Sequence, residues 1–174
     1  MKSAEIAAAL GSMVVLVDTR EHNTACAQKR FEQFGTPYES ATLPFGDYSA
    51  YCTLPNGERF SLVGKCHIER KMSLTELSNN FFQHRERFAR EFERARDAGA
   101  KMYLLVENGS VDKIYRGDYR TAANPNSFTA TMFTWLARYN CHLLFCDAGR
   151  SRQVIHDILY RELKERLMEA VRYA

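Results

Sequence analysis

Three short apolar runs divide the chain, and polar residues follow each of them. The runs cover residues 13–18 (MVVLVD), 102–107 (MYLLVE) and 141–146 (CHLLFC). Apolar runs of this length, without polar alternation, predict strands that are buried on both faces. We therefore expect a central sheet with helices on both of its faces.

Four further stretches space their apolar residues as the buried face of a helix does. They are residues 24–34, 73–98, 126–139 and 151–173. The second stretch opens with Ser73 and Glu76, which form the S-x-x-E pattern of a capping box. Its apolar positions keep helical spacing as far as Ala95, which predicts one long helix.

Residues 38–69 contain shorter strand candidates, at 38–43, 48–54 and 60–69. Asn56-Gly57, between the last two, is a strong hairpin signal, so this region is expected to be antiparallel. Buried strands that alternate with helices, joined to such a region, predict an α/β fold. Its centre would be a mixed β-sheet flanked by helices, in an α/β/α arrangement.

The composition agrees with one domain over residues 1–174. The chain is long enough to bury one core, and 45% hydrophobic and 26% charged residues are ordinary values for a soluble protein. No apolar stretch approaches the roughly 20 residues that cross a bilayer. Glu5 and the early strand-like run argue against a cleaved signal peptide, so a cytoplasmic protein is expected.

Neither the net charge nor the cysteines identify a partner. A formal net charge of +3 is too small to indicate nucleic-acid binding by itself, so any basic surface must be local. The five cysteines include no C-x-x-C pair, which argues against a structural zinc site.

Acidic residues stand at the ends of three predicted strands: Asp18 with Glu21, then Asp47, then Glu69 with Lys71 beside it. In sheets of this kind the ligand crevice lies at strand ends. Carboxylates that meet there are typical of metal-assisted phosphodiester hydrolysis, because Mg²⁺ prefers oxygen ligands and takes few of them from the protein.

The Glu69-Arg70-Lys71 triplet suits this chemistry. Side chains alternate along a strand, so Glu69 and Lys71 point to one face and Arg70 to the other. A metal held by Asp47 and Glu69 would lower the pKa of a bound water and polarise the scissile phosphate. Lys71 would orient the attacking water or neutralise charge on the phosphoryl oxygens.

Each of these features has a simpler interpretation on its own. The Gly-Asp pair at 46–47 is a common turn, and we interpret a second pair at 117–118 as a turn only. Asp18 and Glu21 would also cap the start of a helix. The Glu-Lys pair at the strand end would form a weak surface ion pair. Their joint placement at neighbouring strand ends favours the site.

Three blocks in this order resemble the nuclease domain of the XPF family of structure-specific endonucleases: VDTRE (17–21), LPFGDY (43–48) and IERK (68–71). That family carries D-x-R-E, G-D and E-R-K, a variant of the wider PD-(D/E)xK nuclease signature. The similarity extends through the MYLLVE strand and the elements after it, so it covers most of the chain. It implies the restriction-endonuclease-like form of the α/β/α fold.

The resemblance implies a Mg²⁺- or Mn²⁺-dependent endonuclease that cuts branched, flap or duplex/single-strand junction DNA. Repair, recombination, for example at a Holliday junction, and phage DNA processing would all fit such an enzyme. By the same resemblance, Asp47 and Glu69 would be metal ligands and Lys71 the catalytic lysine. Asp18 would complete the acidic, metal-binding set.

The resemblance also gives roles to three neighbours of these residues. Arg20 and Glu21 would shape the catalytic site or touch the phosphate. Arg70 corresponds to the middle residue of E-R-K, and it would either be structural or help to grip DNA.

Two features depart from the family pattern. Family members have an Asp four residues after the lysine, whereas Thr75 stands there in this chain and Glu76 follows it. Members also often carry a helix–hairpin–helix module after the nuclease domain, and we expect none here because the sequence ends at Ala174 in a predicted helix. It is similar in this respect to nuclease-only members of bacteria and their phages.

DNA contacts would then come from the nuclease domain itself. Arg85 and other arginines of the predicted helix 73–98, with Lys65, are candidate phosphate contacts. Acids between the arginines also suit a solvated helix face with i,i+4 pairs. The broad apolar face at 151–173 leads us to expect a homodimer. The alternative to a nuclease is a non-catalytic DNA-binding or scaffold domain of the same fold.

Overall fold

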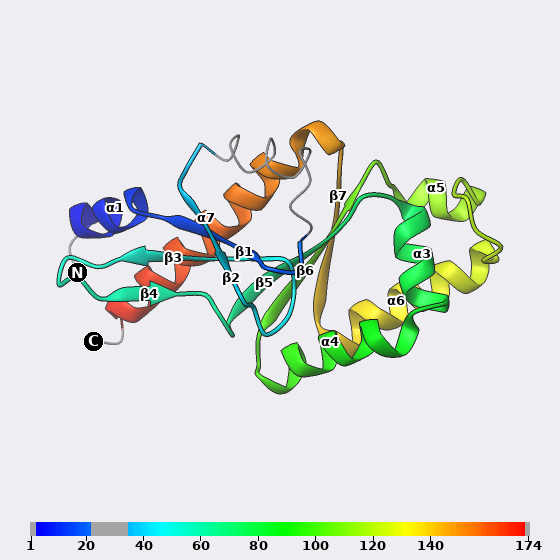
Figure 1. Ribbon diagram of the computed structural model, residues 1–174, viewed down its shortest axis with the longest axis horizontal. Coiled ribbons are helices and arrows are strands. Elements are labelled where there is room, and N and C mark those ends of the chain that lie inside the picture. Colours follow the sequence, from blue (N-terminus) through cyan, green and yellow to red (C-terminus); the bar gives the residue numbers. More distant parts are fainter. Residues whose placement is uncertain (1–2, 22–34, 173–174) are drawn as a thin grey trace.

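The structure is a computed structural model that describes residues 3–21 and 35–172; the helix predicted at 24–34 lies outside them. In the described part, a mixed seven-stranded sheet has the order β2-β1-β3-β5-β6-β7, with β4 paired to β3 (Figure 1). The strands are β1 (Val14–Asp18), β2 (Tyr38–Ala41), β3 (Tyr48–Thr53), β4 (Arg59–Ser61), β5 (Cys66–Lys71), β6 (Lys101–Glu107) and β7 (Cys141–Cys146).

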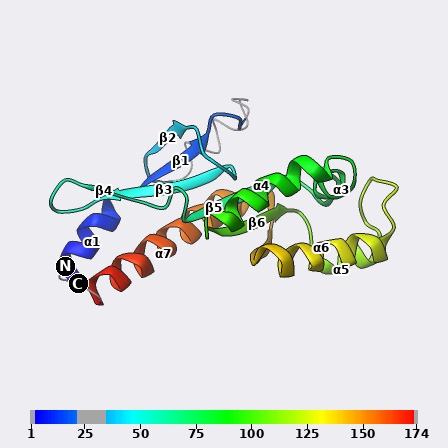
Figure 2. The same ribbon diagram turned by 90° about the horizontal axis from the view of Figure 1, so that it is seen from below.

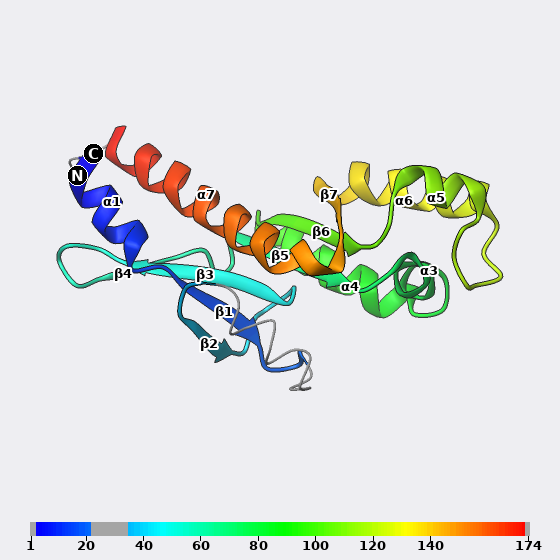
Figure 3. The same cartoon turned by 90° about the horizontal axis from the view of Figure 1, so that it is seen from above.

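Helices cover both faces of this sheet, which confirms the predicted α/β/α arrangement. They are α1 (Ser3–Gly11), α3 (Leu74–Phe82), α4 (Arg85–Asp97), α5 (Val111–Arg116), α6 (Pro125–Tyr139) and α7 (Ser151–Arg172), with a short 3-10 turn η1 (Ala148–Arg150) before α7. α1 and α7 pack on one face, and α3, α4 and α6 pack on the other (Figures 2 and 3). No helix in the described ranges is long and apolar enough to cross a membrane.

Strand β6 shows why the central strands are apolar without alternation. Leu105 packs into the core under α1 and α7, whereas Met102, Leu104 and Val106 pack into the core around Trp135 of α6. Because each face of the strand meets a helical layer, both sets of side chains are buried. The three apolar runs were therefore correctly interpreted as strands.

The topology brings Asp18, Asp47 and Glu69 to the same end of the central strands. β1 and β5 both pair antiparallel with β3, so β1 and β5 run in the same direction, and β6 and β7 are parallel to β5. β2 pairs parallel with β1, so the expectation of a fully antiparallel region was wrong for this strand. The hairpin prediction is confirmed: Gly57 occupies the turn between β3 and β4 with φ +84°.

Residues 60–69 form parts of two strands, where one was predicted. β4 ends at Ser61 and β5 begins at Cys66, and a tight turn separates them. Within the turn, the Lys65 N–H donates to the Leu62 carbonyl, and Gly64 takes the left-handed conformation with φ +74°. A glycine inside a strand pattern is a known sign of such an interruption.

The long helix predicted at 73–98 is two helices, α3 and α4. The N–H groups of Gln83 and His84 both donate to the Asn79 carbonyl, which ends α3. The break lets aromatic rings from both helices contact the indole of Trp135. The ring centres of Phe81 on α3 and Phe88 on α4 lie 5.0 and 5.3 Å from the centre of the Trp135 ring. Tertiary packing around Trp135 therefore overrides the continuous helical spacing.

Strand β7 was predicted to be buried, and this was wrong: of its six side chains only Cys141 is buried. β7 is an edge strand of the sheet, and His142 and Leu144 are exposed. Helix α5 was not predicted. Ser110 caps its start by accepting from the Lys113 N–H, and Gly117 ends it with φ +72°. The Gly-Asp pair at 117–118 is thus a turn, as interpreted.

Most of the broad apolar face of helix α7 is buried against the sheet of the same chain. Ile155, Leu159, Leu163 and Leu167 are buried against the sheet. Nearer its end, other apolar residues of α7 line a groove that is shared with Ile6 and Leu10 of α1, a helix that was not predicted. The two ends of the described chain lie close together there (Figure 3).

Candidate active site

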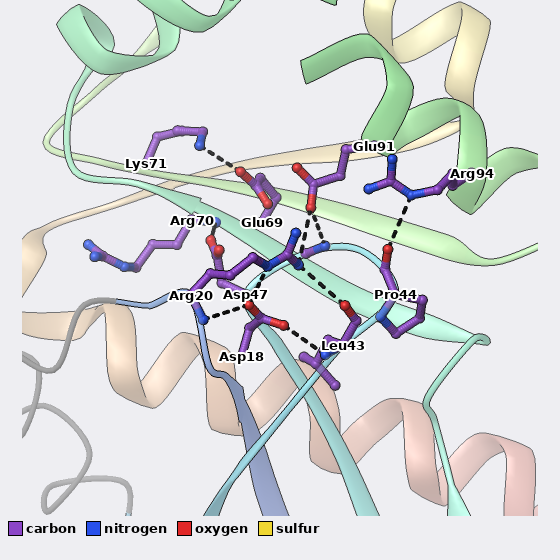
Figure 4. Close-up of polar contacts among 11 residues, drawn as sticks. Asp18, Arg20, Leu43, Pro44, Asp47, Glu69, Arg70, Lys71, Glu91 and Arg94 are labelled. Carbon is purple, nitrogen blue, oxygen red and sulfur yellow. Dashed lines mark hydrogen bonds and ion pairs between the residues drawn. The ribbon is translucent and has the colours of Figure 1, made fainter. Parts of the chain in front are cut away.

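Glu69 and Lys71 lie side by side on the face of β5 that α4 covers (Figure 4). The Lys71 ammonium donates to Glu69 Oε1 over 2.6 Å, and it lies 5.0 Å from the centre of the Phe88 ring on α4. The two side chains are only 8% and 5% exposed. The pair is therefore a buried one, in which loss of either partner leaves an uncompensated charge.

Asp47 is held by the backbones of the strands on either side of it. Its N–H donates to the Ile68 carbonyl, and its own carbonyl accepts from the Asp18 N–H, both over 2.8 Å. Its Oδ2 accepts from the Arg70 N–H over 2.7 Å. These bonds place Asp47 beside the end of β5, next to Glu69.

Gly46 makes this placement possible. It has φ +68°, and a Cβ there would lie 3.0 Å from the Cβ of His67 and 3.1 Å from the Ile68 carbonyl oxygen. Only glycine adopts this conformation without strain and leaves room for β5. The Gly46-Asp47 pair is thus a turn that also delivers a carboxylate.

The cluster contains more negative than positive charge. Burial and the nearby Glu69 raise the pKa of Asp47 well above its usual value. Burial also raises the pKa of Glu69 to about 7, although Lys71 acts to lower it. Burial alone would lower the pKa of Lys71, but Glu69 and Asp47 raise it overall. One ammonium therefore faces two carboxylates, of which Glu69 is buried and Asp47 is half-buried.

The donor set fits a divalent cation. Among the described residues, Glu69 Oε2 has no hydrogen-bond partner although it is buried, which is costly for a carboxylate oxygen. Asp47 and Glu69 would supply two oxygen ligands, and Mg²⁺ keeps waters in its other positions. Across residues 3–21 and 35–172, no three His, Cys, Asp or Glu side chains are grouped so that they could hold a metal ion by themselves.

Asp18 connects the loop before Asp47 to Arg20 through the two oxygens of its carboxylate. Oδ2 accepts from the Leu43 N–H over 2.7 Å, and Oδ1 accepts from the N–H and the guanidinium of Arg20. Burial alone would raise the pKa of Asp18, but these hydrogen bonds and the Arg20 charge lower it overall. Arg20 itself is 57% exposed, at the rim of the site.

Arg70 lies on the opposite face of the sheet, buried between two carboxylates. Its guanidinium is 3.0 Å from Glu107 Oε1 at the end of β6 and 3.5 Å from Glu21 Oε1. It is 6% exposed. Of its two possible roles, this geometry favours the structural one, and it makes Glu21 a partner of Arg70.

The structure does not bring Lys65 and Arg85 to the carboxylates. Lys65 precedes β5, so it stands at the opposite end of the strand, with its ammonium 5.3 Å from the centre of the Phe60 ring. Arg85 begins α4 and lies over Trp135. With Arg87 and Arg90 it lines a hollow at the junction of α3 and α4.

Glu76 occupies the neighbourhood where the family has its last Asp. Its Oε1 lies 3.8 Å from the Lys71 ammonium, and its Oε2 accepts from the Met72 N–H over 2.8 Å. Ser73 caps α3 as predicted, by accepting from the Glu76 N–H. Thr75 turns away and accepts from the Arg120 N–H.

Two further acidic residues reach this region without having been predicted as site residues. Glu107 closes an apolar run, as Asp18 does, so the same signal was present in the sequence. Glu91 of α4 accepts from the Gly46 N–H over 2.8 Å. Its surroundings in the sequence resemble those of Glu86 and Glu93, so no sequence signal separates it from a solvated residue.

Comparisons with known proteins agree with this geometry. A family model described as the ERCC4 domain matches residues 17–152. XPF from Aeropyrum pernix is similar in structure, with a TM-score of 0.62 and 24% identity over 92% of this chain and 69% of that chain. For XPF from Aeropyrum pernix in complex with DNA, the TM-score is 0.61 and the identity 22%, over 87% of this chain and 65% of that one.

No curated protein matches the chain by sequence. The segment matched by the family model nevertheless contains the D-x-R-E, G-D and E-R-K blocks, which the fold brings to one edge of the sheet. The chain therefore belongs to the ERCC4 domain family and has the fold of the XPF nuclease domain.

Proposed function

We propose that this chain is a Mg²⁺- or Mn²⁺-dependent endonuclease that hydrolyses phosphodiester bonds in branched, flap or junction DNA. The observation that supports it best is Glu69 Oε2, a buried carboxylate oxygen without a partner, beside Asp47 and Lys71. Nucleases of the ERCC4 family in general depend on divalent metals, which agrees with this donor set.

In this proposal, Asp47 and Glu69 hold the cation. A bound divalent cation would lower the pKa of a coordinated water and polarise the scissile phosphate. Lys71 stays protonated between the carboxylates, so its charge is available to phosphoryl oxygens as they become more negative. Asp18 keeps the loop of Asp47 in place, and Glu21 keeps Arg70 in place.

DNA would approach from the rim where Arg20 is exposed. Arg85, Arg87 and Arg90, at the α3–α4 junction, offer further phosphate contacts. That XPF from Aeropyrum pernix has been solved in complex with DNA supports a DNA substrate for the same fold. Lys65 lies at the other end of β5, and it would reach DNA only if the duplex extends along the molecule.

We further propose that the chain forms one nuclease domain and acts as a homodimer. Apolar residues that the chain leaves exposed include Phe133 of α6, at 49%, and Leu144 of the edge strand β7, at 36%. Such residues are candidates for burial against a second copy. Repair, recombination or phage DNA processing in the cytoplasm of a bacterium would suit this activity.

The test is cleavage of labelled linear duplex, flap, fork and four-way junction DNA. The reactions should contain Mg²⁺, Mn²⁺ or EDTA, and they should be repeated with Glu69→Gln. Cleavage that requires the metal and is lost in the variant supports the nuclease, and the preferred substrate identifies its DNA structure. Size-exclusion chromatography with mass measurement at micromolar concentration tests the homodimer.

The alternative is a DNA-binding or scaffold domain of the same fold without catalysis. Binding of branched DNA without cutting, in both Mg²⁺ and Mn²⁺, would establish it. Thr75, which stands in place of the family's Asp, would then be the first residue to replace, as Thr75→Asp.

A further inference from the structure

Glu91 connects helix α4 to the turn that carries Asp47. Its Oε1 accepts a hydrogen bond from the Gly46 N–H over 2.8 Å, and its side chain is 17% exposed. Figure 4 shows Glu91 and Arg94 reaching from α4 to this loop, where Arg94 donates to the Pro44 carbonyl over 3.3 Å. The Arg20 guanidinium lies 3.9 Å from the same Glu91 oxygen.

Gly46, whose N–H donates to Glu91, is also confined by its own conformation and by strand β5. Gly46 is in the left-handed conformation, and the backbone and side chain of β5 lie directly against its Cα. Asp47 follows it at once and bonds to the Arg70 N–H on the other side. The turn is thus fixed from β5 by Arg70 and from α4 by Glu91.

A carboxylate at this position has an electrostatic cost. Glu91 lies near the Glu69–Asp47 cluster, which already has more negative than positive charge. The nearby Arg20 guanidinium and the hydrogen bond to Gly46 both offset this cost, and an amide oxygen would accept the same bond without the charge. The bond and the charge can therefore be separated by substitution.

We infer that Glu91 is a positioning residue: it fixes Gly46, and through it the carboxylate of Asp47, in the place from which Asp47 binds the metal. The inference rests on the proposed metal-dependent nuclease. Residues that orient metal ligands typically change metal affinity by 10–100-fold when they are removed. Glu91 would thus act on the metal site without touching the metal or the DNA.

The experiment compares Glu91→Ala with Glu91→Gln. Glu86→Ala is the control, since Glu86 is on the same helix with its side chain 93% exposed. The probe is Mn²⁺ without DNA, measured by calorimetry or by electron paramagnetic resonance. We expect Glu91→Ala to weaken Mn²⁺ binding by about 10-fold or more. Glu91→Gln and Glu86→Ala should bind Mn²⁺ with an affinity within about 2-fold of that of the unmodified protein. Recovery by glutamine would show that the hydrogen bond to Gly46, and not the charge of Glu91, supports the metal site.

A second measurement needs no metal. Hydrogen exchange of the Gly46 amide should be faster in Glu91→Ala and near normal in Glu91→Gln, because the amide loses its acceptor only in the first variant. Unchanged Gly46 exchange in Glu91→Ala, or equal Mn²⁺ affinity in all three variants, would overturn the positioning role. If Glu91→Ala fails to fold, a Glu91→Gln protein that binds Mn²⁺ 10-fold more weakly overturns it.

Failure of this inference differs from failure of the proposed function. If the unmodified protein binds Mn²⁺ and Glu91→Ala binds it equally well, the role of Glu91 is wrong and the nuclease proposal is untouched. If the unmodified protein does not bind Mn²⁺ at all, the metal-dependent nuclease is overturned, and the role of Glu91 toward the metal is overturned with it.

Discussion

The backbone N–H of Arg70 donates to Asp47 Oδ2 over 2.7 Å, while the side chain of Arg70 points to the opposite face of the sheet. The same residue therefore fixes a site carboxylate through its backbone and supports the far face through its guanidinium. The G-D and E-R-K blocks are joined by this bond, so they form one structural unit although Asp47 and Arg70 are 23 positions apart in the sequence.

Removing the Arg70 side chain should lower stability. Arg70→Met leaves Glu107 buried without its partner, and such a loss typically costs about 3–5 kcal/mol. Urea denaturation of the variant measures it. The double variant Arg70→Met/Glu107→Gln should recover part of the loss, because it removes the unpaired charge. A single variant as stable as the unmodified protein would contradict the buried pair.

Lys71→Met should abolish cleavage. The methionine fills the space beside Phe88 but brings no charge to the phosphate, and we expect a loss of about 100-fold or more. Initial rates on the preferred DNA measure it, and binding of the same DNA should change little. Lys65→Met, at the other end of the same strand, is the matched control and should retain cleavage.

Divalent metal should stabilise the fold. A ligand present at 100 times its dissociation constant raises the free energy of unfolding by about 2.7 kcal/mol. Thermal denaturation with Mn²⁺ and with EDTA should show this increase in the unmodified protein. Glu69→Gln removes one of the proposed ligands and should show little or none. An equal increase in both proteins would place the metal elsewhere.

The hydrogen bonds and charges around Glu162 predict that the free energy of unfolding decreases in acid. Glu162 accepts from the Lys101 ammonium and the Tyr103 hydroxyl, both over 2.7 Å. Burial alone would raise the pKa of Glu162, but these bonds and the charges of Lys101 and Arg166 lower it overall. The native state then binds this proton less tightly than the unfolded state. The stabilisation is complete above the ordinary pKa near 4.5 and is lost as the pH falls through the lower native value.

The corresponding variant is Glu162→Gln. At pH 7 it should be less stable than the unmodified protein by about 1–3 kcal/mol, and the difference should shrink below pH 4.5. Denaturant titrations at several pH values give both quantities. Glu165→Gln, an exposed position on the same helix, should show no such trend.

DNA affinity should depend strongly on salt if phosphate contacts dominate. The logarithm of the binding constant falls by about 0.9 for each contact per tenfold rise in salt. Arg85→Gln should therefore reduce the magnitude of this slope by about 0.9, the value for one phosphate contact, and it should weaken the binding of all DNA substrates similarly. Fluorescence anisotropy over a range of salt concentrations measures the slope. An unchanged slope would remove Arg85 from the DNA surface.

Those features of the sheet and the site that depend on the order of apolar and polar residues within one segment could be predicted from the sequence. The apolar runs gave the central strands, and the alternation of Glu69, Arg70 and Lys71 gave their faces correctly. The break between α3 and α4 was not predictable, because it depends on Trp135, a residue on a later helix. The run at 141–146 is equally apolar in a central or an edge strand, so its exposure was missed.

The site was predicted less completely than the fold. The sequence pattern predicted that Asp47 and Glu69 would be neighbours. It did not show that one oxygen of Asp18 accepts from Leu43 in the loop before Asp47 and the other accepts from Arg20. Glu91 was missed because its role depends on which residue faces Gly46 across space. That information arises only when α4 packs on the sheet.

The helical layer formed by α1 and α7 lies largely outside the segment that defines the family. Leu159, Leu163 and Leu167 follow residue 152, and Leu10 precedes residue 17, yet all four are buried in the same core. Burial of each leucine contributes about 1.5–3 kcal/mol, a large share of the 5–15 kcal/mol that holds a typical domain together. A fragment trimmed to residues 17–152 would keep every motif residue and still lose the support beneath them. We therefore expect the smallest autonomous folding unit to be larger than the part of the chain by which its family is recognised.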